Sequence, residues 1–352
     1  MEGRNSRMAM RGLSFVHYSA LDKFYQQFDG AIGMIFSIRA MTDQKHEKFA
    51  PRAQNFIHPD FIKPAVSILK RRGIDIVTLA EARKRIMRPK PYERFAVFTV
   101  DSVNRHTCDH ALETFKENDI PYTLYVATGL IEGNGTFVDE AVEELIRRQD
   151  RILLQTKAGT FTLDCTSVAG KYRSYAILMN HLRNEIEDEA VADRVREICW
   201  LYRIDADEIR NENVISWEDV ARYDAARHCS VASGTIGGAR LSKLTDDKVK
   251  YEITQSCLVL EGVTGIKCRD IAYPMGCKDG VGSREFDIAR KARLQTAVTS
   301  CPGLIYPEHR KHLHALPRIT LGAAYQRRRY FGPLTTGLPT RLSNYGRRMV
   351  FR

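Results

Sequence analysis

The sequence has no run of eighteen apolar residues, so no segment is long enough to cross a bilayer as a helix. Its N-terminal stretch begins with charged residues and lacks both a continuous apolar region and a clear cleavage site, which argues against a secretion signal. The eight cysteines are scattered and form no C-x-x-C pair. Scattered thiols are typical of a reduced cytosolic protein rather than of a disulfide framework or a thiolate zinc site. We therefore expect a cytoplasmic protein.

Acidic residues are missing from His309 to Arg352, a stretch that contains ten Lys or Arg, whereas the rest of the chain is close to neutral. The net charge of +11 therefore belongs to the C-terminus. We expect residues 323–352 to form a basic tail that could contact an anionic membrane surface, such as the inner face of the membrane, or a lipid-linked glycan. Nucleic acid is not expected as a partner. The alternative is a solvated terminal extension, because charge runs are not specific.

The phosphate-binding fingerprints are also absent. The stretch "ASGTIGGARLSKL" (232–244) follows a short apolar strand and contains three closely spaced glycines, as phosphate loops often do. It matches neither G-x-x-x-x-G-K-[ST] nor G-x-G-x-x-G. A phosphate loop is therefore not favoured, and the glycines need another explanation.

What the chain does contain is a repeated strand–helix pattern. Such a pattern predicts an α/β fold with a parallel sheet, open or closed into a barrel. The stretch of about 137–223 breaks the pattern with a predicted hairpin, whose turn is at Lys157-Ala158-Gly159, and with two long amphipathic helices, so we interpret it as an α+β insertion. We expect an N-terminal extension (1–32), one main domain (33–322) and the tail. The predicted strands are 33–38, 74–79, 94–100, 121–127, 229–233, 269–274, 295–300 and 314–320.

Active sites of parallel α/β folds form at the carboxyl ends of the strands. Polar or turn-forming residues follow several predicted strands, and Asp101 ends the most apolar of them. At that position an acid is more often functional than a helix N-cap. Arg318, on the last strand, either pairs with a buried acid or acts on a substrate.

The order of these strand ends resembles the polysaccharide deacetylases with a NodB homology domain, carbohydrate esterase family 4, in the exopolysaccharide-associated branch. "FTVDSV" (98–103) resembles the family's T-F-D-D-G motif. "ASGTIGGARLS" (232–242) is in frame with G-S-H-T-x-T-H-P-x-L-S, and "YPMG" (273–276) resembles Y-P-x-G. The resemblance covers about 33–322. It implies a deformed parallel (β/α) barrel and a polysaccharide or oligosaccharide partner.

The same resemblance predicts that the family's metal site is lost. The family binds zinc or another divalent metal through the second Asp of the first motif and two His of the second, while the first Asp is the general base. Here the base position is Asp101, and the metal positions are Ser102, Gly234 and Gly238. A neutral serine is a poor ligand and glycine offers no side chain. The family's base-orienting Arg is Ala272.

These departures predict a catalytically degenerate, deacetylase-like protein of carbohydrate metabolism that has no metal cofactor and keeps a glycan groove. The residues expected to line that groove are Thr99, Ser102, Thr235, Tyr273, Pro274 and Gly276.

Two alternatives stay open. The first is an active N-acetyl or O-acetyl hydrolase that uses Asp101 with a displaced or absent metal. His106 and His110 have a spacing that can place two imidazoles on one helix face, with Asp101 and Asp109 nearby. The other interpretation is that both are polar surface residues on the first turns after a loop, since a pair of histidines without a further ligand is weak evidence.

The second alternative is a non-enzymatic scaffold that docks through the basic tail.

Near the last strand, His312 or His314 could be the family's general acid, or both could be surface groups.

Overall fold

The computed structural model describes residues 29–90, 93–277 and 279–351. These residues form two compact units. The first contains 29–43, 55–128 and 215–351, and the second contains 44–54 and 129–214. Within the described residues, none of the helices combines the length and apolarity needed to span a membrane.

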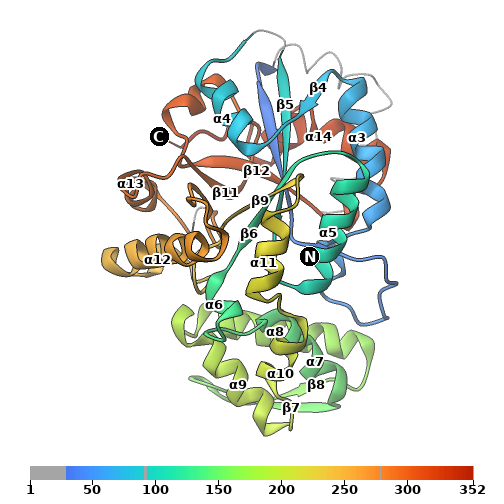
Figure 1. Ribbon diagram of the computed structural model, residues 1–352. Coiled ribbons are helices and arrows are strands. Elements are labelled where there is room, and N and C mark those ends of the chain that lie inside the picture. The colour runs from blue at the N-terminus through green and yellow to red at the C-terminus, as the bar shows by residue number, and fades with distance from the viewer. Residues whose placement is uncertain (1–28, 91–92, 278, 352) are drawn as a thin grey trace. The chain divides into compact units, whose positions relative to one another are not determined.

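The first unit is built on a closed parallel barrel (Figure 1). Seven strands form the ring in the order β1-β12-β11-β10-β9-β6-β5, and β5 pairs with β1 to close it. A further strand, β4, pairs with the first half of β5. The predicted α/β fold with a parallel barrel is thus confirmed. The strands are β1 Gly33–Ile38, β4 Ile74–Ile76, β5 Arg94–Asp101, β6 Tyr122–Val126, β9 Cys229–Ser233, β10 Asp270–Ala272, β11 Thr296–Pro302 and β12 Leu316–Leu321.

The barrel strands are apolar because helices and loops cover their outer face while side chains fill the interior. All six residues of β1 are buried, and so are the six residues of β5 from Phe95 to Val100. The ring of Phe98 packs 5.3 Å from that of Phe36 and 5.5 Å from that of Phe115 on the following helix. This packing fixes the β5 end, where Asp101 lies.

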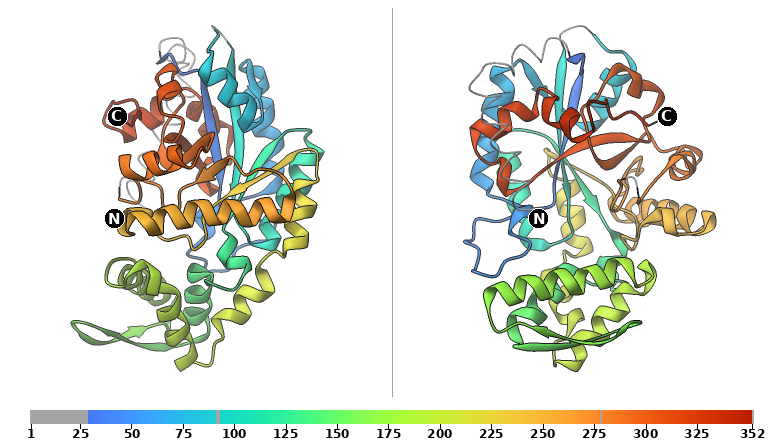
Figure 2. Two further views of the ribbon diagram at one scale, coloured as in Figure 1. Left: turned by 60° about the vertical axis from the view of Figure 1, so that its left-hand side comes forward. Right: turned by 180° about the vertical axis from the view of Figure 1, so that it is seen from behind.

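Helices connect the strands in the manner of (β/α) units. Side-chain caps begin several of them: Thr78 caps α4, Asn104 caps α5 and Ser216 caps α11. The long helix α12, seen lengthwise in the left panel of Figure 2, ends at Gly265, whose φ of 71° suits a glycine. The helices are α3 Ile62–Arg71, α4 Leu79–Met87, α5 Arg105–Glu117, α11 Trp217–Asp224, α12 Asp246–Thr264 and α13 Ser283–Lys291. The short helix α6, Thr128–Ile131, belongs to the second unit from Gly129 onward.

Short elements complete this unit. Two short parallel strands, β2 Ala40–Met41 and β3 Phe56–Ile57, pair with each other next to α5. The 3-10 helices of this unit are η2 Pro59–Phe61, η4 Leu241–Lys243, η5 Pro307–Lys311 and η6 Ala323–Tyr325. Another, η1 Ala53–Asn55, lies mostly in the second unit.

The predicted basic tail is folded onto the barrel. It contains α14 (Arg328–Leu334) and α15 (Leu338–Ser343). Phe331 is fully buried, with its ring 5.3 Å from Phe36 and 5.4 Å from Phe61. Residues 323–351 are therefore part of the barrel's packing. Of the predicted N-terminal extension, 1–32, residues 1–28 lie outside the described part of the chain.

The second unit has a hydrophobic core of its own, formed mainly by residues from Ala141 to Ala206 together with Phe49. The predicted hairpin is present, with β7 and β8 paired antiparallel. The unit contains α7 Val138–Arg148, β7 Arg151–Thr156, β8 Gly159–Asp164, α8 Val168–Asn184, η3 Asp188–Ala190, α9 Val191–Leu201 and α10 Ala206–Asn213. The expected insertion of about 137–223 overlaps this unit, although α11 belongs to the first unit.

Candidate metal centre

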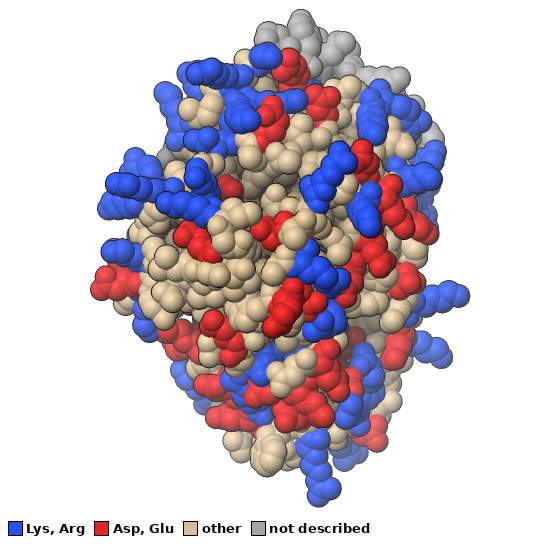
Figure 3. All heavy atoms as spheres, viewed as in Figure 1, with Lys and Arg blue, Asp and Glu red and all other residues tan. Residues whose placement is uncertain are grey.

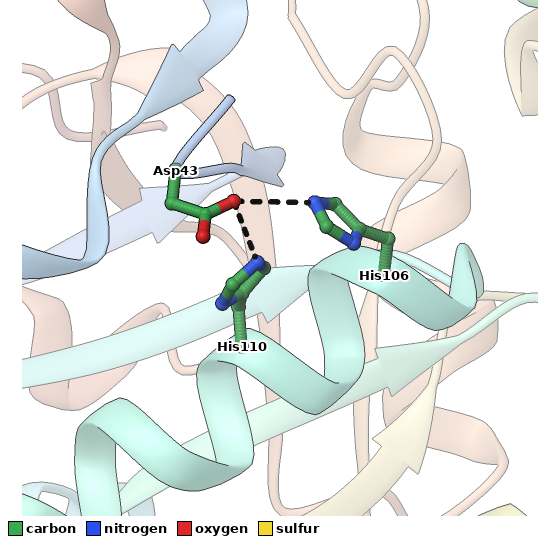
Figure 4. A group of neighbouring side chains, drawn as sticks. All are labelled: Asp43, His106 and His110. Carbon is green, nitrogen blue, oxygen red and sulfur yellow. Dashed lines mark ion pairs between the residues drawn. The ribbon is translucent and has the colours of Figure 1, made fainter. Parts of the chain in front are cut away.

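The carboxyl edge of the barrel brings together Asp43, His106 and His110 (Figure 4). Asp43 follows β1, and both histidines lie on α5, the helix that follows β5. Because β1 and β5 pair along six residues, their carboxyl ends are neighbours. This is the edge at which parallel barrels place their active sites.

The local sequence fixes the position of the two histidines. Asn104 accepts a hydrogen bond from the Thr107 amide and so starts α5 just before His106. His106 and His110 then lie one turn apart on the same face of the helix. Their ring centroids are 4.4 Å apart, with the ring planes nearly perpendicular.

A hydrogen bond holds the connection after β1 against this helix; this connection, residues 39–43, contains the short strand β2 and is called the β1 loop here. The backbone amide of Met41 donates to the hydroxyl of Thr107, which is buried. Two residues further along the loop, the Asp43 Oδ1 atom lies 3.4 Å from His110 Nε2 and 4.0 Å from His106 Nε2. The hydroxyl of Thr42 lies 3.2 Å from the same His106 nitrogen.

The donor set fits a divalent cation such as zinc. Two imidazole nitrogens and one carboxylate oxygen lie within 4.8 Å of one another, and catalytic zinc sites commonly use three protein ligands of these kinds. At zinc–ligand distances of about 2.0–2.1 Å, tetrahedral ligands lie roughly 3.3 Å apart, close to the Asp43–His110 separation. Asp43 and His106 are 56% and 43% exposed, which leaves one side open.

Electrostatics also favour ligation. Partial burial lowers the pKa of His106, and the neighbouring His110 lowers it further. A lowered pKa keeps the imidazole neutral, which is the form that binds a metal.

The prediction of a degenerate protein without a metal site is therefore wrong. It considered the family's motif positions, Ser102, Gly234 and Gly238, as the source of the ligands. In the structure, side chains of the required kinds lie instead on α5 and on the β1 loop. The alternative with a displaced metal is the better supported one.

Sequence reasoning found the two histidines but missed their carboxylate partner. Asp109 is bound to Arg222 and to the Tyr223 hydroxyl, each at 2.8 Å. The partner is Asp43, which follows the first strand of the barrel. Its position after a strand was a usable signal, but only closure between β1 and β5 brings it to the histidines.

Asp101, the predicted base, forms a second polar centre at the end of β5. Its carboxylate accepts hydrogen bonds from Arg318 Nη1 at 2.6 Å and from the Ser37 hydroxyl at 2.9 Å. Arg318 is 2% exposed and also donates to Thr99 Oγ1 and to the Thr299 carbonyl. Of the two roles considered for Arg318, the structure shows pairing with an acid. Arg318 brings this guanidinium from β12, whereas the alanine at position 272 has none.

The glycine stretch has a structural explanation. The Gly234 amide donates to the Val126 carbonyl, and a Cβ at Gly234 would lie 3.2 Å from the Val126 backbone. Thr235 and Gly238 have φ values of 68° and 72°. The amides of Ile236 and Gly237 both donate to Glu252 Oε2, at 2.9 and 3.1 Å. Since the Glu252 carboxylate already accepts these amide hydrogens, they are not available to bind a phosphate.

Several predicted groove residues are internal. Thr99 is fully buried, and its hydroxyl donates to the Phe36 carbonyl. Tyr273 is 2% exposed, and its hydroxyl donates to the His314 carbonyl. Thr235 is also fully buried. These side chains support the wall of the barrel.

The other predicted groove residues form turns. Ser102 Oγ accepts a hydrogen bond from the Asn104 amide. Pro274 is partly buried, and the buried Gly276 carbonyl accepts from the Ser300 amide.

His312 and His314, the predicted general-acid candidates, precede β12 and so lie at the amino end of that strand. Asp101 ends β5, at the opposite edge of the barrel, so the structure does not bring these residues together. The ring of His314 contacts the Leu294 carbonyl at 2.9 Å.

Two solved structures are similar in fold. One is the Streptococcus pyogenes deacetylase PplD in complex with acetate, with a TM-score of 0.53 and 15% identity, covering 82% of this chain and 92% of that chain. The other is IcaB from Ammonifex degensii, with a TM-score of 0.52 and 12% identity, covering 87% of this chain and 98% of that chain. At these identities the likeness shows the fold alone. No protein-family model matches the chain, and no curated protein matches it significantly.

Proposed function

We propose that this protein is a metal-dependent hydrolase that removes acetyl groups from a carbohydrate. The observation that carries the proposal is the group of Asp43, His106 and His110 at the carboxyl edge of the barrel. These three side chains would hold a divalent cation, with zinc as the first candidate because of the donor set. When bound, such a cation lowers the pKa of a coordinated water and polarises an acyl carbonyl.

The chain supplies the remaining groups. We assign Asp101 as the general base, which accepts a proton through its carboxylate. Arg318 and Ser37 hold that carboxylate in one orientation through the two hydrogen bonds described above. A base fixed in this way needs little reorganisation during the reaction.

The substrate class follows from two independent supports. The motif order of the sequence resembles that of polysaccharide deacetylases, and one structure of the same fold is described as a deacetylase with bound acetate. We therefore propose an N-acetylated or O-acetylated polysaccharide or oligosaccharide, lipid-linked glycans included. The cytoplasmic location predicted from the scattered cysteines stays a prediction, as does docking of the tail to an anionic membrane.

Metal analysis of the purified protein tests the proposal. The wild type is expected to bind about one Zn²⁺ per chain in calorimetric titration, and His110→Ala is expected to lose this binding. Acetate release from chitooligosaccharides or acetylated polysaccharide should depend on the added cation and should disappear in His110→Ala and in Asp101→Asn.

His58→Ala is a matched control, because His58 is an exposed histidine outside the triad. It should bind metal and release acetate as the wild type does. Equal zinc binding by the wild type and His110→Ala would overturn the assignment of the metal centre. Zinc binding without acetate release from any acetylated glycan would overturn the proposed reaction while leaving the metal centre in place.

A further inference from the structure

The amino edge of the barrel, opposite the candidate metal centre, is crowded with basic residues. Four strands of the ring, β5, β10, β11 and β12, are each preceded by two or three Lys or Arg. We call this set the basic rim. It consists of Arg88, Lys90, Lys267, Arg269, Arg290, Lys291, Arg293, Arg310 and Lys311.

The rim is continuous because its strands are neighbours. β10, β11 and β12 are consecutive in the ring, and β1 alone separates β12 from β5. Helix α4, which leads to Arg88, contacts η5, which contains Arg310 and Lys311. Burial lowers the pKa of His314, and the positive charges of Arg290 on α13 and Arg83 on α4 lower it further, so these helices bring their cations to one place. Figure 3 shows the blue side chains gathered over α4 and α13 at the upper left of that view.

Few acids balance this charge. Glu93 pairs with Lys90 at 3.2 Å, Asp287 with Arg290 at 2.8 Å, and Glu308 with Arg348 at 3.3 Å. The buried Glu285 pairs with Arg284, which is outside the rim, and the partly buried Asp270 interacts electrostatically with Arg269. Within the described part of the chain, the other seven cations of the rim make no ion pair. Lys291 is in the last turn of α13, where a cation also interacts well with the helix dipole. That explanation does not extend to Lys267 and Arg269, which lie in a loop.

Exposed apolar side chains lie between these cations. Met87, next to Arg88, is 46% exposed, and Ile266, next to Lys267, is 61% exposed. Basic residues interleaved with exposed aliphatic ones are typical of surfaces that bind lipid headgroups, whereas proteins that bind single-stranded nucleic acid interleave aromatic ones.

We infer that the basic rim docks this protein on a membrane surface rich in anionic phospholipid. This surface differs from the C-terminal tail, because its residues come from 88–90 and 267–311. Docking through the amino edge turns the carboxyl edge, with Asp43, His106 and His110, away from the lipid.

Vesicle co-sedimentation of the full chain tests the inference. The probes are vesicles of phosphatidylcholine alone and of phosphatidylcholine with 30% phosphatidylglycerol. We expect wild-type protein to bind the anionic vesicles, with an affinity that falls as salt is raised, and not the neutral ones. The rim variant Lys267→Glu/Lys291→Glu/Lys311→Glu should bind at least about 100-fold more weakly, because each surface cation contributes roughly a factor of five to ten.

The matched control reverses three exposed cations of the second unit, Arg151→Glu/Lys157→Glu/Arg173→Glu, which changes the net charge by the same amount. It should retain vesicle binding, as should His110→Ala, which separates this inference from the proposed reaction. Circular dichroism checks that both triple variants are folded. Absence of wild-type binding to anionic vesicles, or an equal loss in the control triple, would overturn the inference. Tighter binding to a DNA duplex than to the vesicles at the same salt, lost in the rim variant, would also overturn it.

Discussion

The Nη1 atom of Arg318 lies 2.6 Å from Oδ1 of Asp101, although the two residues belong to strands that β1 separates in the ring. The guanidinium is almost fully buried, while a quarter of the Asp101 side chain is exposed. The arginine therefore orients the carboxylate from inside the barrel and leaves its outer side open at the carboxyl edge.

Replacing Arg318 should affect both stability and activity. Arg318→Met is expected to lower the free energy of unfolding by about 3 kcal/mol, because it removes one partner of a largely buried ion pair. It should also reduce kcat for acetate release. Denaturant unfolding and steady-state kinetics measure the two effects. Arg88→Met, an exposed arginine without an ion pair among the described residues, is the control and should change stability by less than about 0.5 kcal/mol. An unchanged kcat in Arg318→Met would contradict the positioning role.

The lowered pKa of His106 should influence how zinc binding depends on pH. Its lowered pKa keeps the imidazole neutral at pH values where an ordinary histidine, with a pKa near 6.5, is already protonated. The His106 imidazole is therefore expected to stay available to zinc below pH 6.5, and its contribution to the affinity is expected to fall only in more acidic solution. Calorimetric titration at a series of pH values tests this. A loss of binding centred above pH 6.5 would contradict it.

Asp43→Asn should weaken zinc binding by at least about 100-fold, since loss of an outer hydrogen-bonding partner alone typically costs 10–100-fold. The change keeps the size of the side chain but removes its charge. Asp60→Asn, a change of an exposed carboxylate outside the triad, serves as the control and should bind zinc normally. Equal affinity of Asp43→Asn and the wild type would exclude Asp43 as a ligand.

The buried His309 should make the protein sensitive to acid. Burial lowers its pKa to about 4, and its ring contacts the carbonyl of Met349 at 3.0 Å. The unfolded chain binds a proton near pH 6.5, whereas the folded chain does so only near pH 4. Stability should thus fall as the pH drops through this window, by up to about 3 kcal/mol. Melting temperatures measured from pH 7 to pH 4 should show a smaller decrease for His309→Gln than for the wild type.

Glu252 should control the exchange of the glycine loop. Its carboxylate accepts the amide hydrogens of Ile236 and Gly237, so Glu252→Ala frees both. We expect the exchange of these two amides with solvent to rise by about tenfold or more, because charge-assisted hydrogen bonds are the stronger ones. Hydrogen exchange measured by mass spectrometry gives the rates. Unchanged rates would show that the loop is held by other contacts.

Phe331 should anchor the C-terminal helices. Phe331→Ala leaves a cavity between Phe36 and Phe61 and is expected to cost about 3–5 kcal/mol. Denaturant unfolding measures this cost. Tyr345→Ala is a control, because Tyr345 is 93% exposed, and it should have little effect. A cost below 1 kcal/mol for Phe331→Ala would contradict the packing described.

The fold could be predicted from the sequence because each barrel strand is a short apolar run followed by a helical stretch. The end of β5 at Asp101 followed from the same pattern. The metal centre could not, because its residues come from two connections that are far apart in the sequence. The spacing of His106 and His110 indicated a shared helix face, but only the pairing of β1 with β5 shows that Asp43 lies opposite them.

The motif comparison led to a wrong conclusion about the metal site. It matched Gly234 and Gly238 to the two metal-binding histidines of the family, and neither glycine offers an imidazole. The inference of a lost metal site assumed that one loop must supply the ligands. Arg318 illustrates the same point, because the guanidinium that contacts Asp101 comes from β12 and not from the position of Ala272.

The pairing of β1 with β12 also constrains how the chain folds during synthesis. The first strand of the ring, Gly33–Ile38, completes its hydrogen bonds on one side only when Leu316–Leu321 has left the ribosome. Until then β1 has one partner, β5, and an open edge that is prone to mispairing. The second unit, whose core comes mostly from one continuous stretch, can fold long before the ring closes. Slow, late closure is therefore the expected rate-limiting step, since contacts between distant parts of the chain form slowly.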